Sequence, residues 1–264
     1  MKRTSPPFHL QRAPLIYVVA QAVFSEIVAM ERFVPEIQEN LRHKGFPRFL
    51  RGQVHEIALQ ADGSPKFNAA ERFEFQNKEA SLGIVLQTKS VAVHTNRYSN
   101  YESFEEQLRT ALMAVHRVVK ISLAERLGLR YVNLVRLETG EKWSDYINPG
   151  LLGLDASSIG VSGWTSRAEF IGPTQVGSLA IRYWQSGQPI PPDLGISGTL
   201  SDSPVLPPGE IATTLDFDHF VQQSSDFVVS DVMSKFEQLH EQLDTVFAAS
   251  VTPKALVRWG KTEE

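Results

Sequence analysis

The sequence predicts an α+β protein built from mostly antiparallel sheet and long amphipathic helices. Three short strand-like segments, 72–76, 81–87 and 90–95, follow one another with polar turns between them. Such spacing is typical of an antiparallel meander. Apolar residues then recur at helical spacing over 104–119 and again over 232–247, which indicates two long amphipathic helices.

The first element we expect is a buried strand over Leu15–Phe24. Basic residues precede it, and Ala20-Gln21-Ala22 looks like the cleavage site of a secretory signal. However, the apolar run before that site has five residues, whereas a signal peptide needs roughly seven to fifteen. A helix over Ser25–Arg42 should follow and should end before Gly45.

The two long helices are predicted together with their N-terminal caps. Ser103 and Glu106 have the spacing of a capping box at the start of the first helix. Ser230 should cap the second helix, because a serine side chain can accept a hydrogen bond from the first turn.

Domain organisation follows from the repeated order of elements. In each half of the chain a meander feeds a long helix, which suggests two related meander-plus-helix halves. We place the halves at 1–137 and 164–264. The linker between them is 138–163, which is rich in Gly, Ser, Asn and Asp.

The segment 187–209 is a long loop rich in Pro, Gly and Ser. Loops of this length inside a compact domain are usually functional or disordered. Two interpretations stay open: a hairpin tip without a role of its own, or a partner-binding arm that offers Ile190, Leu194 and Ile196.

Composition excludes several classes of function. The net charge of −4 argues against general binding to nucleic acid, which needs a basic surplus. The chain has no cysteine, so disulfides, iron–sulfur clusters and cysteine zinc sites are excluded. The sequence contains no run of about twenty apolar residues of the kind that predicts a membrane span. We therefore expect a cytoplasmic protein, and we assign it no cofactor and no metal ligand.

The stretch RLGLRYVNLVRL, residues 126–137, reads as a strand with two different sides. One side is apolar apart from Asn133, and the other carries Arg126, Arg130 and Arg136. The first two arginines are about 13–14 Å apart along a strand, too far to grip one phosphate as neighbours. We favour ion pairs to acidic residues across the sheet or under the linker, and a groove for an anion or an acidic partner at Arg126 and Arg130 stays open.

The strongest candidate for catalysis is Asp216-Phe217-Asp218-His219. In a strand, Asp216 and Asp218 point to the same side, so they can share a divalent cation such as Mg²⁺ or divide acid and base roles. His219 is the adjacent titratable side chain. We favour a solvated strand end over a site, and the chain contains no phosphate-loop, nucleophile-elbow or zinc-protease motif.

Further candidates gather where a strand meets the first long helix. His94, Tyr98 and Tyr101 form a mixture that can line a ligand pocket. We favour a structural role in which the two tyrosines cover the start of the helix. His240 falls on the apolar face of the last helix, where a hydrogen-bonded histidine at the rim of the core is expected.

Several local patterns occur in order along the chain. They are Pro14-Leu15, Pro35-Glu36-Ile37-Gln38, Gly45-Phe46-Pro47, Tyr98 with Tyr101 and Phe104, Arg126-Leu-Gly-Leu-Arg130-Tyr131-Val-Asn133, and Ala255-Leu256-x-x-Trp259-Gly260. Together they resemble a sporadically distributed, functionally uncharacterised family of bacterial proteins of about this length. The resemblance implies a bacterial, cytoplasmic protein and supplies no catalytic residue.

Three functions compete on this evidence. We favour a non-catalytic protein-binding protein that uses a free sheet edge and the 187–209 arm to bind a partner or a second copy. The patchy distribution that the resemblance implies suits an accessory or neutralising component of a bacterial defence or toxin–antitoxin locus. The alternatives are a metal-dependent hydrolase or nuclease using Asp216 and Asp218, and a small-anion sensor using Arg126 and Arg130.

Overall fold

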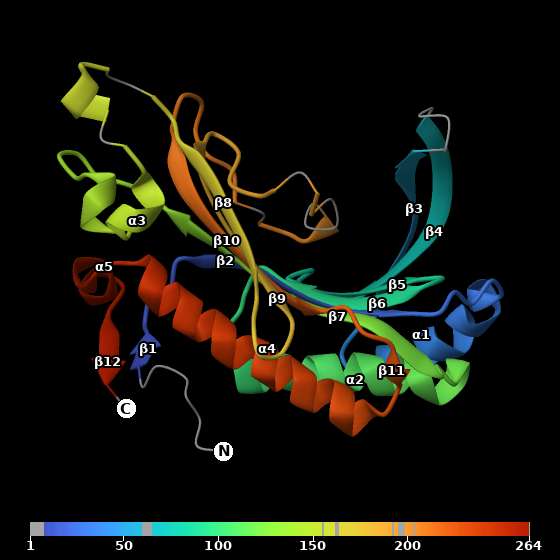
Figure 1. The fold of residues 1–264 in the computed structure, drawn as a ribbon. Coiled ribbons are helices and arrows are strands. Elements are labelled where there is room, and N and C mark those ends of the chain that lie inside the picture. Colours follow the sequence, from blue (N-terminus) through green and yellow to red (C-terminus); the bar gives the residue numbers. More distant parts are fainter. Residues whose placement is uncertain are drawn as a thin grey trace.

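The computed structural model describes residues 8–59, 65–154, 156–161, 164–191, 193–194, 199–202 and 204–263. Within these residues the fold is α+β, as predicted, and its main feature is a ten-stranded antiparallel sheet (Figure 1). The strand order is β3-β4-β5-β6-β2-β7-β10-β9-β8, and β11 also pairs with β7. A separate ladder joins β1 to β12.

The strands are β1 (Phe8–Leu10), β2 (Leu15–Phe24), β3 (Arg48–Leu59), β4 (Pro65–Gln76), β5 (Leu82–Gln87), β6 (Ser90–Thr95), β7 (Leu123–Val135), β8 (Arg167–Pro173), β9 (Ser178–Ser186), β10 (Ala212–Val221), β11 (Ser225–Asp226) and β12 (Lys261–Glu263). The helices are α1 (Val34–Arg42), α2 (Tyr101–Val119), α3 (Pro149–Leu152), α4 (Val229–Ser250) and α5 (Pro253–Arg258). None of the described helices has both the length and the apolar character that crossing a membrane requires.

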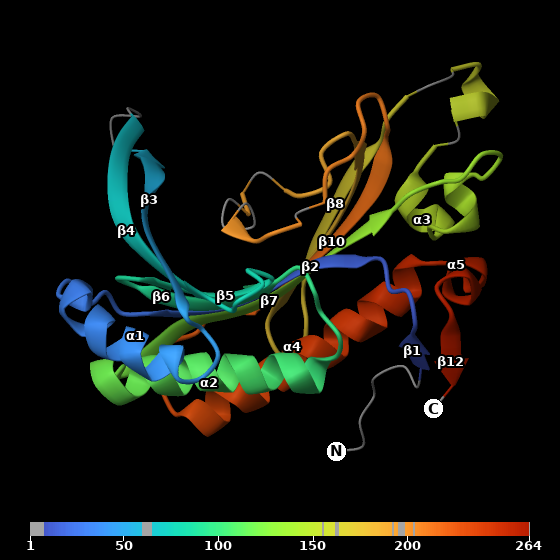
Figure 2. The ribbon, with the colours of Figure 1, turned by 180° about the vertical axis from the view of Figure 1, so that it is seen from behind.

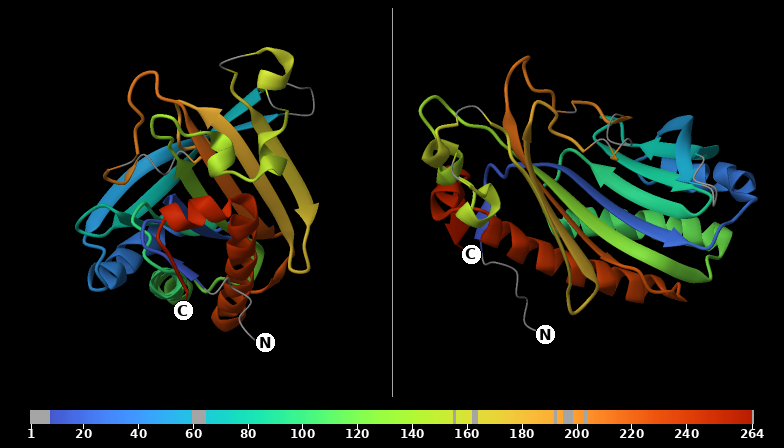
Figure 3. Two further views of the ribbon diagram at one scale, coloured as in Figure 1. Left: turned by 90° about the vertical axis from the view of Figure 1, so that its left-hand side faces the viewer. Right: turned by 45° about the horizontal axis from the view of Figure 1, so that its top comes forward.

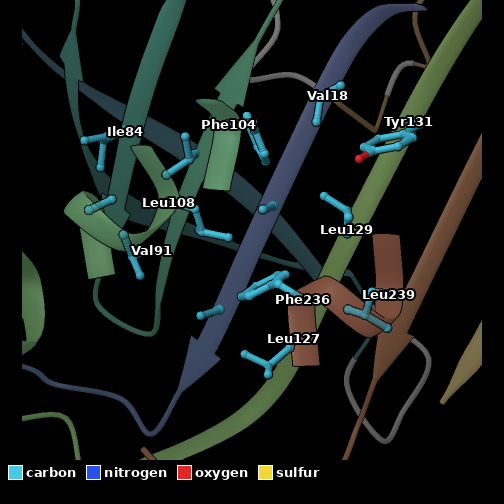
Figure 4. Close-up of a cluster of buried hydrophobic side chains, with 14 of the residues drawn as sticks. Val18, Ile84, Val91, Phe104, Leu108, Leu127, Leu129, Tyr131, Phe236 and Leu239 are labelled. Carbon is cyan, nitrogen blue, oxygen red and sulfur yellow. The ribbon is translucent and has the colours of Figure 1, made fainter. Parts of the chain in front are cut away.

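The main core lies between the sheet and the helices α1, α2 and α4, which share one face of the sheet (Figures 1 and 2). Figure 4 shows how Leu127 and Leu129 of β7 meet Phe236 and Leu239 of α4. Side chains spaced three or four residues apart on a helix share a face, which explains why the apolar stripe of α4 is buried.

The strand β2 lies between β6 and β7 at the centre of the sheet, and residues on both of its faces are buried. Val18 and Ala20 face the helices, whereas Tyr17 and Val19 belong to a second apolar cluster on the opposite face. Leu194 and Leu200, from the segment between β9 and β10, complete that second cluster. A strand covered on both faces needs a nearly continuous apolar sequence, which explains its signal-like composition.

The predicted strand over 126–137 is confirmed as far as Val135, where β7 ends, and Arg136 and Leu137 lie just beyond it. Leu127, Leu129 and Tyr131 are buried on the helical side of the sheet, as their alternation predicted. The opposite side carries Arg126 and Arg130.

The caps of the two long helices differ from the prediction. The first helix begins at Tyr101, and the side chain of Asn100 accepts a hydrogen bond from the backbone N–H of Ser103 at 2.8 Å. Ser103 therefore lies in the first turn and is not the cap. Ser230 likewise lies inside α4, whose capping residue is Val228. The backbone is extended at Asn100 and at Val228, so each helix begins at the residue that follows.

Strands from both predicted halves lie in one sheet, because β7 pairs with β10. Tyr146 and Ile147, from the segment expected to be a linker, belong to the main core. A β-bridge joins Ile147 to Val251. Each half does contain a meander followed by a long helix, and a common origin of the two halves stays a prediction.

Candidate functional site

Charged side chains gather on the sheet face opposite the helices. We call this group the ionic cluster, and it consists of Arg126, Arg130, Glu169, Arg182, Asp193, Asp216 and Asp218. Strand register brings it together. Asp218 lies opposite Arg130, Asp216 lies opposite Arg182, and Arg182 lies opposite Glu169. The cluster therefore crosses β7, β10, β9 and β8.

The centre of the ionic cluster is a buried, two-pronged bond between Arg130 and Asp216. The arginine Nε and Nη2 atoms donate to the two carboxylate oxygens of Asp216 at 2.7 and 2.6 Å. Asp216 has no exposed side-chain surface, and Arg130 has 10%. Its Nη1 also donates to Asp193 at 2.6 Å. Burial disfavours the arginine's charge, but the bonds to both aspartates outweigh burial and raise the pKa of Arg130.

The other two arginines of the β7 stretch also have acidic partners. Arg126 lies 3.6 Å from Asp218 and stacks over the ring of Phe220 at 4.6 Å. Burial raises the pKa of Asp218, against the effect of the neighbouring arginines. Arg136 donates to both oxygens of Glu210 at 2.5 and 2.6 Å. The prediction that these arginines pair with carboxylates is confirmed, although Asp193 and Glu210 lie in the segment between β9 and β10 and not on a strand across the sheet.

These ion pairs bear on the catalytic and anion-binding hypotheses. Asp216 and Asp218 share a side of β10, but Arg130 and Arg182 take up the Asp216 carboxylate. Among the residues that the structure describes, no three His, Asp or Glu side chains are placed to hold one metal ion. Arg130 already binds two carboxylates. The geometry therefore favours neither a shared cation nor an anion site here.

The side chain of His219 points away from Asp216 and Asp218, to the opposite face of β10. Its Nδ1 lies 3.2 Å from the carbonyl oxygen of Leu239, so Nδ1 carries the hydrogen and donates a hydrogen bond to that carbonyl. The hydroxyl of Thr174 then donates to Nε2 at 2.9 Å. Burial lowers the pKa of His219. The candidate grouping of Asp216, Asp218 and His219 is wrong, because neighbouring residues in a strand face opposite ways. The favoured solvated strand end is wrong too, since the Asp216 side chain is fully buried and that of Asp218 is 14% exposed.

A second polar group on the same face as the ionic cluster was missed by sequence reasoning. The hydroxyl of Tyr17 lies 3.0 Å from Nδ1 of His94, and Nε2 of His94 lies 3.1 Å from a carboxylate oxygen of Glu74. All three residues are buried. Burial, above all, lowers the pKa of His94. Gly83 makes this possible, since a Cβ there would lie 2.4 Å from Nε2 of His94.

Glu74 also holds the 187–209 segment, which we call the covering segment, against the sheet. The Thr199 hydroxyl donates to Glu74 at 2.7 Å, and the Gln76 amide donates both to Glu74 at 2.7 Å and to the carbonyl of Thr199 at 2.9 Å. Burial opposes ionisation of Glu74, but the bonds from His94, Gln76 and Thr199 lower its pKa overall. The alternation of Glu74 and Gln76 along a strand was the one signal of this group in the sequence.

Several described residues of the covering segment pack on the protein itself. Leu194 is buried in the second apolar cluster, and Ile190 packs against it. Asp193, between them, binds Arg130. The expectation that Ile190 and Leu194 are offered to a partner is corrected, because the valines and Tyr17 on this face of the sheet need cover. Ile196 lies outside the described residues.

Tyr98 and Tyr101 lie on the helical face of the sheet, away from His94. The hydroxyl of Tyr98 meets that of Tyr131 at 3.3 Å, and the latter lies 2.9 Å from Nδ1 of His240. Tyr101 stacks on the His240 ring with centroids 3.9 Å apart. The alternative of a ligand pocket shared with His94 is wrong, because His94 lies on the other face of the sheet. The favoured structural role of the two tyrosines fits these contacts, and the hydrogen-bonded rim histidine at His240 is confirmed.

We expect Asp244, beside His240, to make stability depend on pH. Burial first, then Glu102 and Glu241, raises its pKa from 3.8 to about 7, and Nε2 of His240 lies 3.4 Å away. A raised pKa means that the folded chain holds the proton longer than the unfolded chain, so this contribution to stability falls as pH rises from 3.8 to 7. Asp244→Asn should therefore gain stability relative to the wild type above pH 7, by up to about 2 kcal/mol, and little at pH 4. Urea unfolding across this range measures it, and a difference independent of pH would contradict it.

The strand β8 forms a free edge of the sheet. Among the described residues it pairs with β9 alone, and Figure 3 shows the two strands at the margin of the fold. Phe170 is 48% exposed and Ile171 is 65% exposed. Both line an apolar pocket of about 250 Å³, together with Gly172, Pro173, Thr174, Leu179 and Ile181.

Two ion pairs of Arg182 link this edge to the interior of the sheet. Glu169 of β8 accepts a hydrogen bond from Arg182 at 2.6 Å, and Arg182 continues to Asp216 at 3.4 Å. The ionic cluster thus links the edge strand to the buried centre. Comparison of the chain with protein-family models, with curated proteins and with solved structures finds no match.

Proposed function

We propose that this protein is a non-catalytic binding protein that recognises a protein partner along the free edge of β8. The observation that carries this proposal is a strand whose outer edge is unpaired among the described residues, with apolar side chains exposed beside an apolar pocket. An open edge presents unpaired N–H and C=O groups that accept an added strand, and pockets next to it select side chains.

The size of the pocket supports a side chain as its occupant. Small-molecule sites usually have volumes of about 300–1,000 Å³ and a few polar groups that fix the ligand. The β8 pocket has about 250 Å³, and its lining is mostly apolar. A role as an accessory or neutralising component in a bacterial defence or toxin–antitoxin locus is part of the same proposal, since such components act by binding another protein.

The test uses the tagged full-length chain, expressed in its native host together with an untagged copy. We expect the wild type to retain a partner chain and Ile171→Lys to lose at least about tenfold of it, because a lysine on an edge strand opposes strand addition. Val257→Lys is the matched control, since Val257 is 76% exposed on α5.

The result has a clear contrary outcome. If the wild type retains no chain, or if Ile171→Lys and Val257→Lys retain equal amounts, β8 is not a binding edge and the proposal is wrong. Circular dichroism of both variants checks that the fold is intact.

A further inference from the structure

We infer that the partner on β8 is a second copy of this chain, bound antiparallel about a two-fold axis that passes beside Ala168. This inference rests on the proposed function and names its partner. Three features of the edge fit one another in that single register: the free peptide groups, the charges and the pocket.

The first feature is the direction of the free peptide groups. The N–H of Gln185 donates to the carbonyl of Ser166, and the N–H of Thr174 donates to the carbonyl of Gly177, so the even-numbered residues of β8 bond toward β9. Antiparallel ladders alternate, and the peptide groups of Arg167, Glu169 and Ile171 therefore face the open side. A two-fold axis beside Ala168 pairs these outward groups with each other.

The second feature is charge. With the axis beside Ala168, Arg167 of each copy lies directly opposite Glu169 of the other, and symmetry makes the pair twice. Residues directly opposite in an antiparallel pair share a face and lie about 5 Å apart at Cβ, within reach of an ion pair. Arg167 has no acidic partner among the described residues, and Glu169 is held in place by Arg182. An axis beside Glu169 would instead bring like charges together.

The third feature is the fit between an exposed tryptophan and the pocket. Trp164 is 40% exposed, three residues before β8 begins. In the same register it lies opposite Gly172 of the second copy, which lines the pocket. A Cβ added at Gly172 would meet no atom within 4 Å, so there is open space above it. A self-complementary patch of this kind is what a two-fold interface requires.

The experiment measures the mass of the purified full chain by sedimentation over concentrations from about 1 µM to 0.5 mM. We expect the wild type to reach twice its mass of 29.5 kDa. Arg167→Glu and Glu169→Arg should each be at least about tenfold weaker, because like charges then face each other twice. Mixed together in equal amounts, the two variants should form a heterodimer, since opposite charges face again.

The matched control is Lys235→Glu, which makes the same change of charge on the exposed side of α4 and should leave the dimer intact. A wild type that stays monomeric, a dimer that survives both charge reversals, or a mixture that fails to associate would each overturn the inference. If the tagged chain of the preceding test retains a different protein but no untagged copy, the binding edge stands and the second copy is wrong.

Discussion

Arg130→Met is expected to destabilise the protein by about 3–5 kcal/mol in its free energy of unfolding. The substitution keeps the length of the side chain but removes the cation that binds Asp216 through two hydrogen bonds. Asp216 is fully buried, so water cannot solvate its carboxylate once the arginine is gone. Arg182, 3.4 Å away, is the nearest remaining cation. Urea unfolding at neutral pH, followed by circular dichroism, measures the loss.

Two comparisons separate this effect from a general loss of charge. Arg136→Met breaks an ion pair whose arginine is half exposed, and it should cost less than about 1 kcal/mol. Replacing both partners, as Arg130→Met with Asp216→Leu, should recover much of the stability, because no unpaired charge is then left buried. Equal losses for Arg130→Met and Arg136→Met would show that the centre of the ionic cluster is not desolvated.

Gly83→Ala is the second change with a large expected effect, about 3 kcal/mol or more. The added methyl would lie 2.4 Å from Nε2 of His94 and 2.9 Å from a carboxylate oxygen of Glu74. Both side chains are buried, so neither can move without breaking its hydrogen bonds. Because Glu74 also binds Thr199, the covering segment should loosen as well. Thermal and urea unfolding measure the loss, and proteolysis reports on the segment.

The cause of this loss can be tested by coupling. In a His94→Ala background the closest clash is gone and only the Glu74 oxygen, 2.9 Å from the added methyl, remains, so Gly83→Ala should cost much less there. Gly52→Ala is the matched control in the same sheet, since a Cβ at Gly52 would contact nothing within 4 Å. If Gly83→Ala costs the same with and without His94, the close approach is not the source of the effect.

The two buried polar groups suggest why the covering segment is needed. The face opposite the helices carries Arg130 and Glu74 among apolar residues such as Val19 and Val132. If this face were open to water, the valines would be exposed. If only apolar side chains covered it, the polar groups would lose water without gaining a partner. The segment supplies both, with Leu194 for the valines and Asp193 for the arginine.

Much of the local structure was determined by the sequence itself. Alternation predicted β7 with its two sides, and the 3.6-residue spacing predicted the buried faces of α2 and α4, because these periods follow from backbone geometry alone. The pairing of the β7 arginines with carboxylates was also predictable, because buried guanidinium groups require partners.

Only the tertiary structure decided which residues meet. The register of β7 with β10 placed Asp218 opposite Arg130 and Asp216 diagonal to it, within reach of its guanidinium, and the covering segment brought in Asp193. The contact of His94 with Glu74, twenty residues away, depends on the space that Gly83 leaves between them. The free edge at β8 follows from strand order, which is not a local property. Pairings between distant strands are set by the packing of the whole sheet, and no short stretch of sequence contains that information.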